Sequence, residues 1–265
     1  MPSEIRGYTH IHKPPSDGNP YTFLTLHGTG GTEQDLVEVV ENIDQTAGIL
    51  SPRGTVIDGG QSRFFKRPQG EKFDEADIAL HAKELVLFVN EATQQYNLDR
   101  NNLIWLGYSN GANMVSSIMF LHPEVIQKAI LLRPMVVLSP SRIPTLPEAV
   151  VLMASGRQDP IVAEDTTQKL IHMLQQTGAI VELYLHEGGH HLEDGDTEVA
   201  RNWYMKHTGR TPQVTEQPFE EEPAETITKE ADEDIEQEHL KQPDTVNRVT
   251  SQEDHSENKT EHYAI

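Results

Sequence analysis

A Gly-x-Ser-x-Gly pentapeptide at residues 107–111 restricts the fold of this chain more than any other feature of its sequence. The pentapeptide follows the apolar run Asn102–Leu106 and precedes the helical pattern of Asn113–Leu121. Ser109 is therefore expected on a tight turn from a buried strand into a helix, where its hydroxyl is exposed. The backbone N–H groups at the start of that helix favour a developing negative charge. The motif thus predicts a nucleophilic serine in a sheet flanked by helices.

Short apolar runs alternate with amphipathic segments along most of the chain, as in proteins built on a mostly parallel sheet. The clearest helix is expected over residues 74–96, because apolar side chains recur there at spacings of four and three. Two further helices are expected at Asp165–Gln176 and Glu198–His207. The expected strands are Tyr21–His27, Gly48–Pro52, Asn102–Leu106, Ala129–Arg133, Val150–Ala154 and Ile180–His186. This order predicts an α/β fold with helices on both faces of the sheet.

An additional strand is expected near the N-terminus. Tyr8–Lys13 alternates in polarity and is followed by turn-forming residues at 14–18. We expect this segment to form an antiparallel edge hairpin with the strand that begins at Tyr21.

Composition indicates where the folded domain ends. Hydrophobic residues make up only 36% of the chain, and its net charge is −21. From Gly209 onward, 16 Asp and Glu stand against 5 Lys and Arg. Such a segment buries too little apolar surface to offset the entropy lost on ordering. We therefore predict a folded catalytic domain over residues 1–208 and a disordered acidic tail over residues 209–265.

The residue types that are missing exclude several classes of protein. Cysteine is absent, which excludes a disulfide scaffold, a thiolate metal site and a cysteine nucleophile. No apolar run reaches about 18 residues and the start does not resemble a signal peptide, so a cytoplasmic protein without membrane insertion is expected. An acidic surface repels nucleic acid. A small-molecule substrate is the expected partner, and a homodimer is the one assembly left open.

Two backbone N–H groups are candidates for an oxyanion hole, the set of donors that stabilises negative charge on a substrate oxygen. Asn110 directly follows the serine and supplies the first. The glycine-rich turn at residues 27–31, which follows the first parallel strand, supplies the second at Thr29. By itself this turn also fits an ordinary loop or a phosphate-binding loop, and the serine motif decides in favour of the oxyanion hole.

A serine needs a base to take its proton, and the base needs a carboxylate to orient it. In this fold the chain order is Ser, acid, His. Asp159 and His190 each lie just beyond an expected strand, on the same rim of the sheet as Ser109. Asp165 is the competing acid, but it falls within a helix. His191 is the competing base, but it lies where the chain turns toward the next helix.

A metal site is the other interpretation of the histidine segment. It would use His190, His191, Asp194 and Asp196, and we disfavour it because flexible acidic loops usually stay hydrated. No metal and no cofactor are expected.

Nine ordered motifs resemble the phospholipase/carboxylesterase family of α/β-hydrolases, and within it a bacterial subgroup linked to hydroquinone resistance. They are HGTGG at 27–31, SPRG at 51–54, RFFKR at 63–67, FDEAD at 73–77, DRNNL at 99–103, LGYSNGAN at 106–113, RPMV at 133–136, GRQDPIV at 156–162 and GHHL at 189–192. The resemblance implies an α/β-hydrolase fold and a serine hydrolase of carboxylic esters. It also implies the site residues reached above, Ser109, Asp159, His190, Thr29 and Asn110. Arg133 departs from it, because many members carry His there.

The walls of the substrate pocket are expected from residues near the catalytic rim. Arg53, Phe64, Phe65 and Met135 are the candidates for substrate binding. For the two phenylalanines, a place in the core beneath a long loop is an equal alternative. Only about a dozen residues separate the strand that ends near Val136 from the next strand at Val150, which leaves no room for an inserted lid.

The leading hypothesis is a serine hydrolase of small soluble esters or thioesters. Lysophospholipase, acyl-protein thioesterase and peptidase use the same residues, so the fold does not separate these activities. A hydrolase fold that binds ligands without turnover is the alternative from another class. The complete set of three catalytic residues favours the enzyme.

Overall fold

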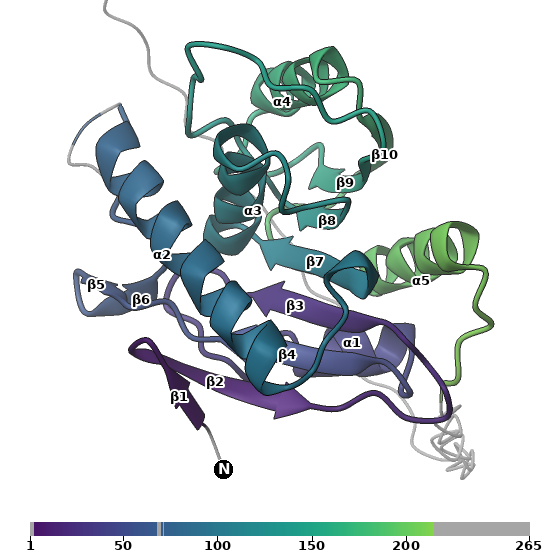
Figure 1. Cartoon of the computed structure of the whole chain (residues 1–265). Helices are drawn as coiled ribbons and strands as arrows, with labels where there is room; N and C mark the ends of the chain where they lie inside the picture. The colour runs from purple at the N-terminus through teal and green to yellow at the C-terminus, as the bar shows by residue number, and fades with distance from the viewer. Residues whose placement is uncertain (1–2, 68–69, 71, 215–265) are drawn as a thin grey trace, which may run out of the picture. The chain divides into compact units, whose positions relative to one another are not determined.

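A mixed sheet of eight strands forms the centre of the computed structural model, which describes residues 3–67, 70 and 72–214. The spatial order of the strands is β1-β2-β4-β3-β7-β8-β9-β10, and β3, β4 and β7 to β10 run parallel (Figure 1). The strands are β1 (Ser3–Ile5), β2 (Tyr8–Lys13), β3 (Thr22–Leu26), β4 (Gly48–Pro52), β7 (Leu103–Tyr108), β8 (Lys128–Leu132), β9 (Val150–Gly156) and β10 (Ile180–His186). The predicted α/β fold is confirmed.

Helices cover both faces of this sheet. They are α1 (Val37–Ile43), α2 (Glu75–Gln95), α3 (Asn110–Leu121), α4 (Glu164–Gln176) and α5 (Asp194–Thr208). Side chains of α2, α3 and α4 share one hydrophobic core with one face of the sheet, and those of α1 and α5 share a second core with the other. Because side chains alternate across a strand, Trp105 belongs to the first core and its neighbour Ile104 to the second.

The long helix α2 begins where the sequence pattern places it. The side chain of Asp74 accepts hydrogen bonds from the N–H groups of Ala76 and Asp77, which have no partner within the helix. Ile78 and Leu85, two of the residues that define the helical spacing, are fully buried. The apolar stripe thus anchors α2 to the sheet.

The N-terminal strand pairs differently from the prediction. β2 pairs antiparallel with β4 and with β1, not with β3. Both edges of β3 are occupied, because β4 and β7 pair with it in parallel. The turn at residues 14–18 therefore carries the chain past β4, and the free edge of β4 accepts β2.

Several short elements were not predicted, among them β1, helix α1 and one hairpin. Helix α1 has only 7 residues, too few for a clear helical period. A hairpin of β5 (Val56–Asp58) and β6 (Gln61–Arg63) forms a separate two-stranded sheet between β4 and α2 in the chain. Three side chains of this hairpin, those of Asp58, Gln61 and Arg63, line a cavity beside Ser109.

The described chain continues past the expected end of the domain at residue 208. Helix α5 ends at Thr208 with Gly209 in the left-handed conformation, which fits the predicted stop. Beyond it, the backbone of Gln213 accepts a hydrogen bond from Gln45 N–H (2.8 Å) and donates one to Asp44 Oδ1 (3.3 Å). The boundary at residue 209 is therefore corrected to a point beyond Gln213. The remaining predicted tail, residues 215–265, lies outside the described residues.

Truncation tests this corrected boundary. A chain that ends at Gly209 is expected to unfold at a lower temperature than one that ends at Val214, because the shorter chain loses both bonds of Gln213. Each bond contributes about 1 kcal/mol. Differential scanning calorimetry of the two truncated proteins measures the difference. Equal melting temperatures would show that residues 210–214 add nothing to the stability of the domain.

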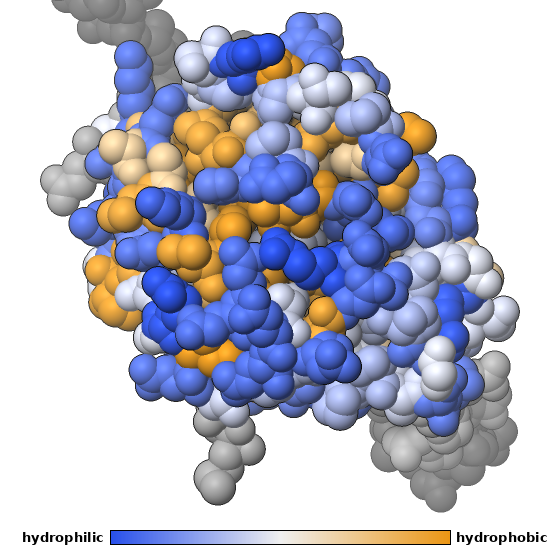
Figure 2. Space-filling model, viewed as in Figure 1, coloured by the Kyte–Doolittle hydropathy of each residue, from blue (hydrophilic) through white to orange (hydrophobic). Residues whose placement is uncertain are grey.

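Within the described residues, no helix is long and apolar enough to cross a membrane. Hydrophilic and hydrophobic side chains are interspersed on the face of the molecule that shows α2 in front (Figure 2).

Candidate active site

Ser109 lies on a strained turn between the central strand β7 and helix α3. Its backbone angles are φ 51° and ψ −113°, a conformation that side-chain-bearing residues rarely adopt. The backbone holds this strain because the Ser109 N–H donates to Leu132 O and its carbonyl accepts from Asn113 N–H, both at 2.9 Å. The turn therefore projects the hydroxyl from the carboxyl end of the sheet.

The two glycines of the pentapeptide permit close backbone contact. A Cβ atom on Gly111 would lie 2.0 Å from Leu26 O on β3, and one on Gly107 would lie 2.6 Å from the backbone of Ala112. Any larger residue at either position would force the turn away from its neighbours. The spacing of small residues around Ser109 is thus a packing requirement of this turn.

The structure brings Ser109, His190 and Asp159 together in one hydrogen-bonded chain. Ser109 Oγ lies 3.0 Å from His190 Nε2, and His190 Nδ1 lies 2.7 Å from Asp159 Oδ2. With Nδ1 protonated and donating to the carboxylate, Nε2 is left free to accept the serine proton. The predicted order of serine, acid and histidine thus has the geometry of a proton relay.

The Asp159 carboxylate is buried and held in place by the loop after β9. Its side chain is 1% exposed, and Oδ1 accepts hydrogen bonds from the N–H groups of Ile161 (2.8 Å) and Val162 (2.9 Å). These bonds leave Oδ2 directed at His190. The competing acid, Asp165, is exposed on α4, where it accepts from Thr166 N–H.

Arg133 holds the loop that carries His190. This side chain is fully buried, and its guanidinium donates to Gly189 O (3.0 Å) and His191 O (2.7 Å), the carbonyls on either side of His190. It also forms a bidentate ion pair with buried Asp196, at 2.8 and 2.6 Å. Both carboxylate oxygens of Asp196 therefore accept hydrogen bonds from Arg133. Asp196 was one of the four residues of the alternative metal site.

Tyr108 adds a third contact to the same loop, because its hydroxyl donates to His190 O at 3.0 Å. Burial raises the pKa of this hydroxyl, so it stays protonated and remains a donor. Three consecutive carbonyls, those of residues 189–191, are therefore held by buried or half-buried donors. His191 itself is exposed.

The glycine-rich turn that carries Thr29 is fixed by His27. The N–H of Gly54 donates to His27 Nε2 (2.9 Å), so the protonated Nδ1 donates to Gly28 O (2.6 Å). Burial lowers the pKa of this imidazole, which agrees with its neutral form. Thr29 lies at the cavity wall with Asn110, whose N–H at the start of α3 has no partner inside the helix.

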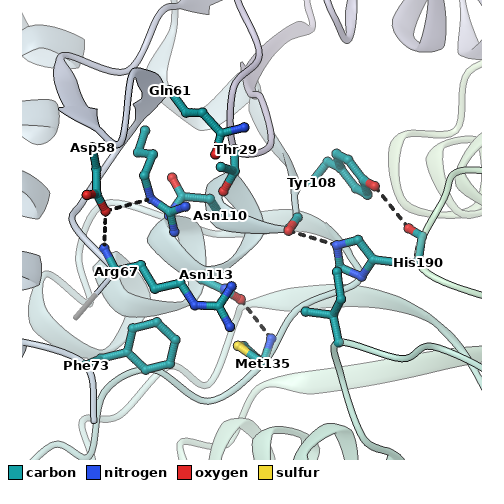
Figure 3. A pocket seen from close by; sticks show the side chains of 13 residues that line it. Thr29, Asp58, Gln61, Arg67, Phe73, Tyr108, Asn110, Asn113, Met135 and His190 are labelled. Atoms are coloured by element: carbon teal, nitrogen blue, oxygen red, sulfur yellow. Dashed lines mark hydrogen bonds and ion pairs between the residues drawn. The ribbon is translucent and has the colours of Figure 1, made fainter. Parts of the chain in front are cut away.

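A cavity of about 500 Å³ opens beside Ser109 and His190 (Figure 3). Of the four predicted substrate-binding residues, the structure places Met135 in its wall. Arg53 does not line the cavity, because its guanidinium pairs with Glu33 at 2.6 and 2.8 Å. Phe64 and Phe65 do not line it either, because both side chains are buried in the core. The two phenylalanines thus take the core position that the sequence left open as the alternative, and Arg53 lies outside the cavity wall.

Several residues of the wall were missed from the sequence. They are Asp58, Gln61, Arg63, Arg67, Phe73, Tyr108, Asn113 and Ile161. The RFFKR motif at 63–67 contained the available signal, since its two phenylalanines point into the core while its first and last arginines reach the cavity.

Comparison with known proteins identifies the family of this chain. Residues 104–199 match the family described as serine hydrolase (FSH1). The putative hydrolase MhqD of Bacillus subtilis (strain 168) is 37% identical over 197 residues, which cover 74% of this chain and 98% of that protein. This chain belongs to the phospholipase/carboxylesterase family of α/β-hydrolases. The family predicted from the sequence motifs is confirmed.

Solved structures extend the comparison to the fold. A carboxylesterase from Bacillus cereus shares 37% identity and a TM-score of 0.73, covering 75% of this chain and 94% of that one. A carboxylesterase from Mesorhizobium loti shares 31% identity and a TM-score of 0.70, covering 74% and 93%. This phospholipase/carboxylesterase family member is therefore an esterase-type serine hydrolase with the α/β-hydrolase fold.

Proposed function

We propose that this protein hydrolyses small, soluble carboxylic esters of short to medium acyl chains through an acyl-enzyme on Ser109. One observation carries the proposal, the hydrogen-bonded chain from Ser109 Oγ through His190 to Asp159 at the edge of an open cavity. Because family members differ in substrate, the cavity rather than the fold supports the choice of ester.

In the acylation step, His190 Nε2 takes the proton from Ser109 Oγ as the oxygen attacks the ester carbonyl carbon. Negative charge then develops on the carbonyl oxygen, where the N–H groups of Thr29 and Asn110 stabilise it. His190 next delivers its proton to the departing alkoxide, so that alcohol leaves and the acyl group stays on Ser109. Asp159 remains ionised and stabilises the transient imidazolium.

In the deacylation step, a water molecule takes the place of the alcohol. His190 removes a proton from this water as its oxygen attacks the acyl carbon, and the same two N–H groups stabilise the second oxyanion. The proton then returns through His190 to Ser109 Oγ, and the carboxylic acid leaves. The relay thereby regains its starting state.

The two adjacent histidines provide a direct test of the base. His190→Ala is expected to lower kcat by about 10³-fold or more, because no other residue that the structure describes forms a hydrogen bond with Ser109 Oγ and can accept its proton. His191→Ala is expected to change kcat less than about threefold, because His191 contributes only its backbone carbonyl to the Arg133 contact. Steady-state kinetics of the two variants on one ester compares them. The reverse order of effects would assign the base to His191.

The entrance to the site has no lid among the described residues. Between β8 and β9 the structure has no helix, and the connecting segment buries Val137, Leu138, Leu146 and Ala149 in the core rather than covering the cavity. Thr29 and Ile161, at the cavity wall, are exposed. Dissolved esters can therefore reach Ser109 without a prior opening step.

An open site predicts smooth saturation kinetics. We expect no jump in rate when the substrate concentration passes the micellar threshold, because a jump arises when a lid opens on a lipid surface. Rates measured across that threshold with one short-chain and one long-chain ester decide the question. Sharp activation at the micelle, or hydrolysis restricted to long-chain lipid, would contradict the open site.

A substrate panel tests the proposed activity itself. The panel contains p-nitrophenyl esters of increasing chain length, a lysophospholipid, an acyl-CoA thioester and an acylated peptide. The proposal predicts the highest kcat/KM for the short and medium esters. Preference for the thioester or the lysophospholipid would change the substrate class, and binding without turnover of any member would indicate a binding module.

A further inference from the structure

The substrate cavity carries an excess of positive charge although the whole protein is strongly acidic. Its wall contains two arginines, Arg63 and Arg67, and a single carboxylate, that of Asp58. The net charge of the chain is −21. A locally cationic cavity in such a protein attracts anions at this place while the rest of the surface repels them.

Arg63 already has partners in the protein. Its Nε donates to Phe65 O at 3.1 Å and lies 4.0 Å from Asp58 Oδ2, and its side chain is 9% exposed. Burial lowers the pKa of this guanidinium, and the charge of Arg67 acts in the same direction. Asp58 thus pairs with the buried arginine, and the two guanidinium groups are close enough to repel each other.

Arg67 has no such partner for its side chain. Its backbone N–H donates to Asp58 Oδ2 at 3.0 Å, but its guanidinium forms no hydrogen bond or ion pair with any residue that the structure describes. Figure 3 shows the side chain of Arg67 extending across the cavity toward Asn113, beside the ring of Phe73. The charged end of Arg67 is therefore presented to the substrate cavity.

Asn113 supplies a second donor at the same place. Its side chain Oδ1 accepts from the N–H of Met135 at 2.7 Å, which fixes the orientation of the amide. The residue is 6% exposed and lines the cavity. Its Nδ2 group has no hydrogen-bond partner in the described part of the chain. A buried amide with its acceptor occupied and its donor unused is suited to a ligand that only accepts hydrogen bonds.

We propose that Arg67 and Asn113 form an anion subsite, and that the preferred substrates are esters carrying a second, anionic group such as a free carboxylate. This inference rests on the proposed esterase function and names its substrate class. The carboxylate accepts charge-assisted hydrogen bonds from the guanidinium of Arg67 and a further one from Asn113 Nδ2. The scissile ester of the same molecule then lies at Ser109, which faces the same cavity.

Matched ester pairs test the subsite on both sides of the scissile bond. For the acyl side, monomethyl glutarate is compared with methyl valerate, which has the same chain length without the carboxylate. For the alcohol side, the valerate ester of glycolic acid is compared with ethyl valerate. The rate is followed by titration of the released acid, and the readout is the ratio of kcat/KM for the anionic ester to that for the neutral ester.

Arg67→Gln is the test variant and Lys66→Gln the matched control. Both remove one positive charge from neighbouring positions, but Lys66 is exposed, lies 3.9 Å from Asp77 and does not line the cavity. Arg67→Gln is expected to lower the ratio about tenfold or more in the preferred series, since the carboxylate of the anionic ester loses its charge-assisted hydrogen bonds to the guanidinium. Lys66→Gln is expected to retain the ratio of the native protein. Arg67→Lys keeps the positive charge but lacks the planar guanidinium that can donate two parallel hydrogen bonds. Its kcat/KM ratio is expected to lie between those of Arg67→Gln and Lys66→Gln.

The outcomes separate the subsite from the esterase function. If the native protein hydrolyses the neutral esters but prefers the anionic ester in neither series, the subsite is wrong and the esterase function stands. If Arg67→Gln retains the preference, Arg67 does not bind the anion and the subsite is wrong. If Lys66→Gln lowers the preference equally, the positive charge acts without contact, which also overturns the subsite. If no ester of either kind is hydrolysed, the proposed function fails and the subsite fails with it.

Discussion

Replacing Ser109 with alanine is expected to lower kcat by about 10⁴-fold or more. The alanine has no atom that can attack the ester. His190 and Asp159 retain their contact, but the hydroxyl proton that His190 accepts is gone. The remaining rate comes from substrate binding and oxyanion stabilisation alone. Rates of ester hydrolysis for the native and Ser109→Ala proteins, measured at saturating substrate, give the ratio.

Stability serves as the control for this variant. Alanine is smaller than serine, and only the hydroxyl contact with His190 is lost, so the free energy of unfolding is expected to change by about 1 kcal/mol or less. Urea unfolding measures this change. A kcat reduced less than about tenfold in a folded Ser109→Ala protein would contradict the role of this serine.

Replacing Arg133 with methionine is expected to have the largest effect on stability. The substitution leaves Asp196 as a buried carboxylate, 2% exposed, without its cation. Removing one partner of a buried ion pair costs about 3–5 kcal/mol. The carbonyls of Gly189 and His191 also lose their donors, so His190 is expected to be misplaced and kcat to fall about 10²-fold. Urea unfolding and steady-state kinetics measure the two effects.

A double variant separates positioning from stability. Asp196→Asn removes the unpaired charge and keeps an oxygen that can accept from Glu193 N–H at the start of α5. Arg133→Met combined with Asp196→Asn is therefore expected to recover much of the free energy of unfolding but to keep a low kcat. Full recovery of kcat in the double variant would show that Arg133 only neutralises Asp196 and does not position His190.

The architecture could be predicted because local sequence signals agree with the global fold. The helical spacing from Ile78 to Leu85 and onward, and the apolar runs of the central strands, each indicate one element with one buried side. The pairing of β2 could not be predicted in this way, because it depends on which sheet edge is free. That edge is fixed by the parallel pairing of β3 with both β4 and β7, which involves residues far apart in the chain.

The juxtaposition of Ser109, Asp159 and His190 followed from topology. Each residue follows the carboxyl end of a parallel strand, and the carboxyl ends of parallel strands meet at one edge of the sheet. The cavity wall was harder to predict, because residues 53–67 form an irregular segment and a short hairpin whose side chains have no periodic pattern. In that segment Phe64 and Phe65 turn into the core, and Arg67 instead reaches the cavity.

The contacts of Arg133 also could not be predicted from the sequence. The sequence marked Arg133 only as a departure from the His that many family members carry, and in the structure its guanidinium points away from solvent into the loop of His190. Its partners, Gly189, His191 and Asp196, lie more than 50 positions later in the chain. No local pattern indicates a contact over that separation.

The most direct test of the account is the site at which a fluorophosphonate probe reacts. The probe forms a covalent bond only with a serine whose proton is removed by a neighbouring base, and mass spectrometry of the digested adduct identifies the modified residue. We expect a single adduct on Ser109, which is absent in His190→Ala and retained in His191→Ala. An adduct on any other residue, or an unmodified Ser109 in the folded native protein, would contradict it.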